Sequence, residues 1–321
     1  MKKKYLSLLL LCLSLVGCKT KEVVELDYLP IADPYVMLYE GKYYAYGTGG
    51  TVEGEGFACF SSDDLKSWSR ESQALSATDS YGTWGFWAPE VYYVESKKKF
   101  YLFYSAEEHI CVATADTPQG PFHQAVKQPI WDEKSIDTSL FIDDDGTPYL
   151  YFVRFTDGNV IWAAQMNDDL TSIKPETLTE CIKVEEPWEL SQDKPAKVAE
   201  GPSILKKDGV YYLVYSANHF ESKNYGVGYA TSDSPMGPWK KYAGNPILQR
   251  TDGLLGTGHG APFRCKDGSW KYIFHAHWDD TKVQPRTSYI KDFAISDHGV
   301  ASIDGSIIKP QVLGTSSKNN E

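Results

Sequence analysis

The sequence has no surplus of basic residues. Its 321 residues contain 43 Asp and Glu against 32 Lys and Arg, which gives a formal net charge of −11 at pH 7. This balance argues against a nucleic-acid-binding protein built on a basic stripe. Amphipathic helical patterns of ten or more residues are also missing, as are Pro-rich or Ser-rich linkers. We therefore expect one domain built mainly from strands.

Cysteine pairs of the C-x-x-C type are absent. Cys59, Cys111, Cys181 and Cys265 are widely spaced, which argues against a zinc framework. A chain of this length does not need disulfides in order to fold, so we expect buried free thiols.

Long apolar runs are confined to the N-terminus. After three lysines, an apolar run extends from Leu6 to Val16, shorter than the ~20 residues of a membrane-spanning helix. This pattern predicts a secretory signal over residues 1–17. The ending Leu15-Val16-Gly17-Cys18 resembles a bacterial lipobox, in which Cys18 carries the lipid; plain cleavage is the alternative. We expect an exported protein that touches the membrane only through this anchor, with residues 18–28 as a tether, on either the periplasmic or the outer side.

Aromatic residues are abundant instead. Nine Trp, 22 Tyr and 13 Phe make up 14% of the chain. This composition is typical of aromatic-rich strands whose rings pack the core, and it also suits a groove that stacks the flat faces of sugars.

Five segments share one pattern, in which a small or polar start leads into an apolar strand, a turn and an aromatic strand. Four of the five turns contain Glu-Gly or Asp-Gly, which tolerate positive φ in tight hairpins. Each segment therefore predicts a β-hairpin. The segments are Asp33 to Tyr46, Pro89 to Tyr104, Asp137 to Phe152, Gly201 to Tyr215 and Ala261 to His275.

This repeat predicts an all-β fold, a five-bladed β-propeller with four-stranded antiparallel blades around a central channel, over residues 29–314. The 304 residues after the signal give about 61 per repeat, enough for a four-stranded blade with its loops. An open β-sandwich is the alternative, which the regular repeat disfavours because sandwiches need no period. Residues 315–321 are expected to form a frayed tail.

Charged residues recur at the start of the predicted blades. Asp33, Glu90, Asp137, Glu200 and His259 stand there, and we expect them at one phase of the repeat, facing one channel. Clustered carboxylates cost free energy unless partners or protons neutralise them, so such a cluster indicates catalysis and raised pKa values.

Short motifs surround these residues. The carboxylates stand in Ala32-Asp33-Pro34-Tyr35-Val36, Ile136-Asp137-Thr138 and Ala199-Glu200-Gly201-Pro202, and further motifs are Trp87-Ala88-Pro89-Glu90, Gly258-His259-Gly260 and Arg286 in QPRTSYI. In order and spacing they resemble glycoside hydrolase family 43, over a similarity that runs from about Leu29 to about Leu313.

The resemblance implies an inverting glycosidase. Inversion needs one carboxylate that deprotonates water on one face of the sugar and one carboxyl that protonates the leaving oxygen on the other. Asp33 matches the family's general base and Glu200 its general acid. Asp137 matches the carboxylate that orients the acid and raises its pKa, because a nearby anion disfavours ionisation.

The resemblance also implies a substrate pocket. Arg286 matches an arginine that holds the substrate, and Trp87 would form an apolar wall for the terminal sugar. Ile136 stands where many xylose-cleaving relatives have an aromatic residue, which leaves the sugar open. For Glu90 we expect either a hydrogen bond in the channel or a structural salt bridge.

No cofactor is expected for the chemistry, but His259 has two possible roles. In much of the family the matching histidine lies beside a calcium ion in the channel, although calcium prefers oxygen ligands. The alternative is a metal-free histidine that tunes Asp137 or Glu200. We expect His275 and His277 to serve blade packing, and Asp143 to Gly146 to form a hairpin turn rather than a calcium loop.

The expected function is exo-acting release of terminal pentose, α-L-arabinofuranose first, from plant-type polysaccharide or oligosaccharide by a monomer. Alternatives on the same scaffold are a β-D-xylosidase, a galactofuranosidase or galactosidase, and an endo-arabinanase. A non-catalytic carbohydrate-binding propeller is the alternative from another class, which the presence of all three carboxylates disfavours. A protein-interaction propeller would carry repeated W-D and G-H signatures, which are missing.

Overall fold

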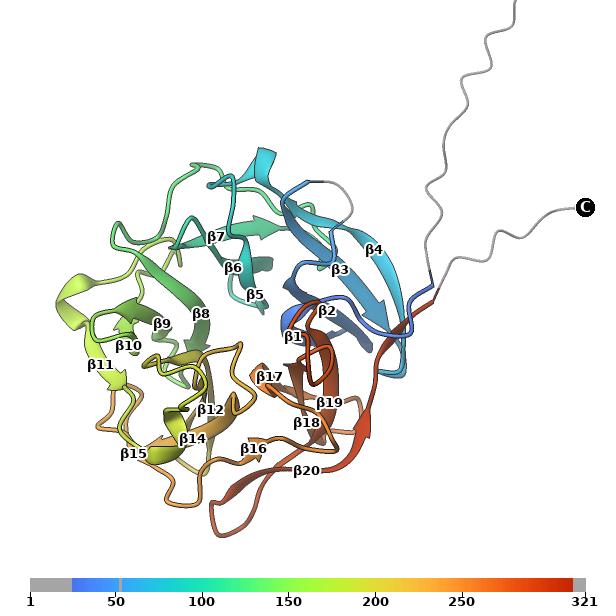
Figure 1. Ribbon diagram of the computed structural model, residues 1–321. Helices are drawn as coiled ribbons and strands as arrows, with labels where there is room; N and C mark the ends of the chain where they lie inside the picture. The colour runs from blue at the N-terminus through green and yellow to red at the C-terminus, as the bar shows by residue number, and fades with distance from the viewer. Residues whose placement is uncertain (1–24, 52–53, 314–321) are drawn as a thin grey trace, which may run out of the picture.

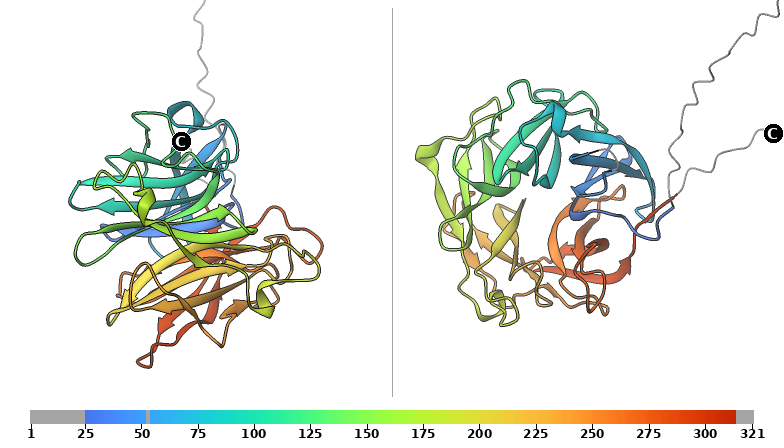
Figure 2. Two further views of the ribbon diagram at one scale, coloured as in Figure 1. Left: turned by 90° about the vertical axis from the view of Figure 1, so that its left-hand side faces the viewer. Right: turned by 45° about the horizontal axis from the view of Figure 1, so that its top comes forward.

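The computed structural model describes residues 25–51 and 54–313, and these form a five-bladed β-propeller (Figure 1). Five sheets follow one another around a central axis, which Figure 2 shows from two further directions. The predicted fold class is confirmed. The predicted signal over residues 1–17, Cys18 and the tail at 315–321 lie outside the described residues. Within 25–51 and 54–313, no helix has the length and apolar character needed to cross a membrane.

Each blade begins with its strand nearest the axis. The first blade contains β1 (Ala32–Tyr39), β2 (Lys42–Thr48), β3 (Gly56–Ser62) and β4 (Ser67–Ser76), and the second contains β5 (Trp87–Val94), β6 (Lys99–Ala106) and β7 (His109–Ala115). The third contains β8 (Ser135–Ile142), β9 (Pro148–Phe155), β10 (Asn159–Gln165) and β11 (Thr179–Ile182). The fourth contains β12 (Ala199–Lys207), β13 (Val210–Ala217), β14 (Gly226–Ser232), β15 (Lys240–Lys241) and β16 (Leu248–Gln249). The fifth contains β17 (Gly258–Arg264), β18 (Trp270–Ala276), β19 (Thr287–Ile295) and β20 (Ala301–Ile308).

The strand count varies between blades, which corrects the expectation of four strands in each. The third and fifth blades have four strands, and the short β15 and β16 both pair with β14 in the fourth. The second blade has three strands, and the segment after β7 adds an isolated bridge between Thr114 and His123. Three short 3₁₀ turns, η1 (Ala77–Asp79), η2 (Pro175–Thr177) and η3 (Pro187–Glu189), lie in the loops.

The ring closes at the outer edge of the first blade. After β20 the chain returns as β21 (Gln311–Val312), which pairs in parallel with β4. Leu26 then forms an antiparallel bridge with Val312, so residues from the two ends of the described chain lie side by side (Figure 1). The last blade is therefore tied to the first by strand pairing as well as by side-chain contact.

The apolar interior is divided into five clusters, each at the interface between two neighbouring blades. The cluster between the first and second blades, for example, contains Tyr46 and Phe57 from the first and Leu102 and Tyr104 from the second, all fully buried. Because a blade can bury its faces only against its neighbours, the five blades stabilise one another as a closed ring.

The four cysteines of the described residues are free thiols. Cys59, Cys111 and Cys265 are buried, and Cys181 is partly buried. Burial raises the pKa of the Cys59 thiol to about 12, so this group is a protonated, unreactive part of the core.

All five innermost strands contain a register shift near their start. The residue within each shift has a positive φ, between 43° and 56°, and the five are Asp33, Ala88, Asp137, Gly201 and His259. This is a β-bulge repeated in each blade, and such bulges turn a side chain out of the regular alternation of the strand. The five charged residues therefore do not all stand at one position of the repeat, as we had expected. Glu200 directly precedes the bulge residue of its blade, and Glu90 follows the bulge residue of its blade by two positions.

The bulges also connect consecutive blades. Three bulge residues donate their backbone N–H to a hydroxyl of the preceding blade: Ala88 to Thr48 Oγ1 at 2.9 Å, Asp137 to Ser105 Oγ at 3.0 Å, and His259 to Ser216 Oγ at 2.8 Å. Each acceptor lies on the second strand of its own blade. There it pairs with the residue that directly precedes the bulge residue of the same blade. These bonds satisfy backbone donors that the bulge removes from the strand ladder.

The remaining two connections differ. His275 occupies the same place in the fifth blade, and its Nδ1 accepts the backbone N–H of Asp33 at 3.1 Å. In the third blade the corresponding residue is Val153, whose side chain has no hydrogen-bond acceptor. The Gly201 N–H therefore donates to Asp137 Oδ2, at 3.3 Å, instead. The backbone of Asp33 and the carboxylate of Asp137 are thus built into the contacts between blades.

Candidate active site

A pocket of about 760 Å³ opens at the end of the axis where the innermost strands begin. All five blades contribute to its lining, and Asp33, Asp137 and Glu200 share it. The structure therefore brings together three acids that stand more than 60 positions apart in the sequence. Trp87, Ile136, His259 and Arg286, which we also expected at the site, line the same pocket.

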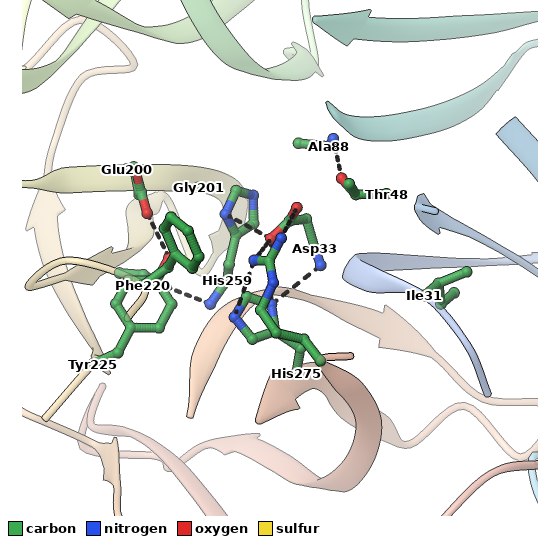
Figure 3. A network of polar contacts seen from close by, with 12 residues as sticks. Ile31, Asp33, Thr48, Ala88, Glu200, Gly201, Phe220, Tyr225, His259 and His275 are labelled. Carbon is green, nitrogen blue, oxygen red and sulfur yellow. Dashed lines mark hydrogen bonds and ion pairs between the residues drawn. The ribbon is translucent and has the colours of Figure 1, made fainter. Parts of the chain in front are cut away.

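Asp33 is held by three positively charged or polarisable groups (Figure 3). Arg286 donates from Nη1 to Oδ1 at 2.6 Å and from Nη2 to Oδ2 at 3.2 Å. His259 Nδ1 and His275 Nδ1 lie 3.4 Å and 3.3 Å from Oδ1. Burial opposes ionisation of Asp33, but the charge of Arg286, followed by that of His259, outweighs it and holds the pKa well below its usual range. Asp33 is therefore a carboxylate at neutral pH, as a general base must be.

The pKa values of the two histidines beside Asp33 shift in opposite directions. Burial, and then Arg286, lower the pKa of His275 to about 3, so its ring is neutral and its Nδ1 can accept a hydrogen bond. Burial also disfavours the charged form of His259, but the carboxylates of Asp33 and Asp137 outweigh it and raise the pKa of His259. We expected His275 to serve blade packing alone; instead it stacks on Tyr225, with ring centroids 5.6 Å apart, and supports Asp33.

Glu200 has a hydrogen-bond donor on each carboxyl oxygen. The Tyr225 hydroxyl donates to Oε1 at 2.8 Å (Figure 3). Asn159 Nδ2 donates to Oε2 at 2.9 Å. Asn159 comes from the third blade and Tyr225 from the loop before β14. These two contacts fix the plane of the carboxyl group, which orients it for proton transfer.

Asp137 lies behind the other two acids and is almost fully buried. Burial, and then repulsion from Glu200 and Asp33, raise the pKa of Asp137 to about 7, although His259 opposes the rise. We expected Asp137 to raise the pKa of Glu200; in the structure the same repulsion acts on Asp137 itself. Asp137 can therefore hold a proton near neutral pH.

Glu90 lies in a small chamber on the axis below the pocket rather than in the pocket itself. The Tyr92 hydroxyl donates to its carboxyl group, and among the described residues no basic side chain forms an ion pair with it. Burial raises the pKa of Glu90 to about 8, so it is largely protonated at neutral pH. Of the two roles that we expected, the geometry supports the hydrogen bond in the channel.

Phe220, from the loop between β13 and β14, forms part of the pocket wall. The Arg286 guanidinium lies over its ring, 4.8 Å from the centroid, which adds a cation–π contact to the ion pair with Asp33. The Phe220 carbonyl accepts a hydrogen bond from His277 Nε2 at 2.8 Å. His277, which we also expected to serve packing, thus fixes the loop that carries Phe220.

Our reading of the sequence missed Asn159, Tyr225, His275 and Phe220. His275 stands at the place that Thr48, Ser105 and Ser216 occupy in other blades, so an alignment of the five second strands would have singled it out. Asn159 and Tyr225 both stand at the start of a third strand, in neighbouring blades. Phe220 lies in a loop with no repeated counterpart, and no pattern identifies it.

The residues around His259 do not make up a calcium site by themselves. Within 25–51 and 54–313, no group of three or more His, Cys, Asp and Glu side chains is arranged to hold a metal ion. His259 Nδ1 faces the carboxylates of Asp33 and Asp137, at 3.4 Å and 4.0 Å. His259 thus lies beside Asp137, one of the two acids that it was expected to tune, and beside Asp33.

A propeller with three acids in one axial pocket is the architecture of a glycoside hydrolase. The family model for glycosyl hydrolases family 43 matches residues 28–300, and the chain belongs to this family. It is therefore a glycosidase that acts on carbohydrate, and family members need no cofactor for the reaction.

Curated relatives carry several substrate names. The chain is 28% identical over 296 residues to the β-D-galactofuranosidase xynD of Aspergillus niger, covering 85% of this chain and 78% of that one. It is 30% identical to a β-xylosidase of Xylanibacter ruminicola, covering 80% and 90%. It is 28% identical to the arabinoxylan arabinofuranohydrolase of Bacillus subtilis, covering 76% of this chain but 55% of that protein.

Solved structures share both fold and sequence. A structure described as an endo-1,4-β-xylanase from Bacteroides thetaiotaomicron is 79% identical, with a TM-score of 0.89, and the match covers 91% of this chain and all of that one. A thermostable family-43 glycoside hydrolase is 35% identical with a TM-score of 0.79, covering 88% and 95%. The names of these proteins differ in sugar and in mode of attack.

Proposed function

We propose that the protein is an inverting, exo-acting glycosidase that releases terminal α-L-arabinofuranose from plant-type polysaccharide or oligosaccharide. The observation that carries this proposal is a single pocket, walled by all five blades, with Asp33, Asp137 and Glu200 in its lining. A walled pocket admits the end of a chain or a side branch, whereas internal cleavage needs a groove that is open at both ends.

In this reaction Asp33 is the general base and Glu200 the general acid. Asp33 is ionised and fixed by two guanidinium contacts, which suits it to take a proton from water. Glu200 is oriented by Tyr225 and Asn159 and protonates the leaving oxygen. Asp137 can hold a proton near neutral pH and accepts the Gly201 N–H, which keeps it beside the acid.

The lining supports recognition of a small sugar. Trp87 and Ile136 give two apolar surfaces against which the carbon faces of a sugar ring can pack. Arg286 and His259 lie at the lining with polar atoms that can hold hydroxyl groups. An aliphatic Ile136 in place of an aromatic side chain leaves room beside the ring.

Three other sugars and one other mode of attack compete with this assignment. The names of the relatives support β-xylose and galactofuranose in the same pocket, and galactose is the third sugar considered. The name of the 79% identical structure supports internal attack on a xylose polymer. An endo-arabinanase, like a xylanase, would need a groove that is open at both ends. A pocket lined by all five blades favours exo action over internal attack on either polymer.

One parallel assay tests the sugar, the mode of attack and the stereochemistry. The purified protein is incubated with nitrophenyl α-L-arabinofuranoside, β-D-xyloside, β-D-galactofuranoside and β-D-galactoside, and separately with arabinan and xylan. We expect the arabinofuranoside to react fastest, and proton NMR to show the inverted anomer first. Release of the retained anomer would overturn the mechanism, and rapid shortening of xylan without monosaccharide release would overturn exo action.

We also propose that the enzyme is exported and anchored to the cell envelope through a lipid on Cys18. The apolar run of residues 6–16 and the ending Leu15-Val16-Gly17-Cys18 support this. Labelled palmitate should enter the wild-type chain but not the Cys18→Ser variant, which should leave the membrane fraction. A wild-type chain that takes up no label while being exported would overturn the anchor.

A further inference from the structure

Trp84 lies outside the pocket and leaves 50% of its surface exposed. An exposed indole ring costs free energy in water, since its apolar faces would be more stable when covered. Its ring meets Trp87 edge to face, with centroids 6.1 Å apart and planes at 73°. Because Trp87 lines the pocket, apolar surface continues from the pocket onto the outside of the molecule.

The segment that carries Trp84 is fixed to the second blade. The Thr83 N–H and hydroxyl both donate to Glu107 Oε1 at 2.9 Å, and the Glu107 N–H donates to the Trp84 carbonyl at 3.0 Å. Gly82 packs against Ala106. A ligand that covers the ring therefore meets a preformed surface and loses little free energy in ordering it.

The pocket lining next to Trp87 includes two glycines. Beyond Thr48, at the end of β2, the lining continues with Gly49 and Gly50. Thr48 Oγ1 accepts the N–H of Ala88, so these glycines lie beside the strand that carries Trp87. This is the side on which a chain attached to the sugar in the pocket would reach Trp84.

The exposed Trp and Phe side chains all lie near the pocket. Among the described residues they are Trp84, Phe155 and Trp278. Phe155 ends β9 and pairs with the pocket residue Asn159, and Trp278 starts a turn that leads to the pocket residue Gln284. Of the three, Trp84 alone has a ring contact with an aromatic residue of the pocket lining, whereas Trp278 packs on Tyr28.

We propose that Trp84 is the platform of an aglycone subsite, where it stacks the sugar ring to which the released sugar is attached. The occupant is therefore a glycan, because a sugar ring offers an apolar face to the indole and keeps its hydroxyl groups in water. The inference rests on the proposed function, since it places the leaving group of that reaction, and it makes oligosaccharides better substrates than simple glycosides.

The test compares Trp84→Ala, Trp84→Phe and Trp278→Ala with the wild type. The substrates are an oligosaccharide and the methyl glycoside of whichever sugar the parallel assay shows to be released. A methyl group does not reach the platform, whereas a nitrophenyl group could stack on it. For Trp84→Ala we expect kcat/KM on the oligosaccharide to fall about tenfold, which corresponds to about 1.4 kcal/mol, mainly through KM.

Three readouts separate this subsite from a structural role. Trp84→Ala should cleave the methyl glycoside at the wild-type rate, and the free monosaccharide should inhibit it with an unchanged inhibition constant. Trp84→Phe should retain part of the preference for the oligosaccharide over the methyl glycoside. Trp278→Ala should retain all of this preference. An equal loss on both substrates, no loss on either, or a loss confined to Trp278→Ala would overturn the proposal. A wild type that cleaves another sugar overturns the arabinofuranose assignment but leaves this comparison valid.

Discussion

Arg286 binds both carboxylate oxygens of Asp33 although 253 positions separate them in the sequence. Asp33 starts the first blade and Arg286 precedes β19 in the last, so the pair joins the two blades that close the ring. The same arginine lies over the ring of Phe220 from the fourth blade. The proposed base is thus held in place by a contact that exists only when the propeller is complete.

This relationship predicts different effects for two replacements of Arg286. Arg286→Lys keeps the charge but loses the two-pronged contact, so kcat/KM should fall about 10- to 100-fold, as expected for losing a charged hydrogen bond. Arg286→Met also removes the charge, so the pKa of Asp33 should rise and the acid limb of the pH profile of kcat/KM should move to higher pH. An acid limb at the same pH in both variants would contradict the role assigned to the charge.

The two proposed catalytic acids should respond differently to the leaving group. Asp33→Asn removes the base and should abolish turnover of every glycoside. Glu200→Gln removes the proton donor, so it should abolish turnover of oligosaccharides but spare part of the activity on dinitrophenyl glycosides, whose leaving group needs little protonation. Asp144→Asn, in an exposed hairpin turn, is the matched control and should leave both activities unchanged. Full activity of either catalytic variant on oligosaccharide would refute the assignment.

His275 should contribute to stability through the Asp33 backbone. His275→Ala leaves this buried N–H without an acceptor, which costs about 1–3 kcal/mol of unfolding free energy. Serine accepts the matching N–H in two other blades, so His275→Ser should recover part of that loss. Urea denaturation of both variants measures the difference. If they were equally unstable, the imidazole would act through packing rather than through this hydrogen bond.

The repeat explains why the fold and the three acids could be predicted. Each hairpin has an apolar strand, a Gly-containing turn and an aromatic strand, and five copies of one motif determine a ring. The bulge could not be predicted in the same way, because four of its five positive-φ positions hold Asp, Ala, Asp and His rather than glycine, so no residue type marks it. Asn159 and Tyr225 were missed because no local pattern marks a residue whose partner, Glu200, lies on another strand.

Activity should fall as the pH rises through about 7. Burial and the neighbouring anions raise the pKa of Asp137 to about 7, so the proton that it holds beside the proposed acid is lost near this pH. Asp137→Asn has no such proton to lose, so kcat/KM should no longer fall at about pH 7, while kcat falls at every pH. The profile is measured with the methyl glycoside between pH 4 and 9, and an alkaline limb that is the same in both enzymes would show that another group sets it.

Glu90 should make the folded protein less stable at higher pH. Its pKa is about 8 in the folded state, because of burial, against an ordinary value of 4.5. Between these values the folded chain binds more protons than the unfolded chain, so the unfolding free energy falls as the pH rises, by at most about 1.4 kcal/mol per pH unit. Glu90→Gln keeps an acceptor for the Tyr92 hydroxyl but cannot ionise, so its stability should decline less between pH 5 and 8. Denaturation midpoints across this range test the sign, and a decline as steep as in the wild type would mean that Glu90 is already ionised at pH 5 in the folded protein.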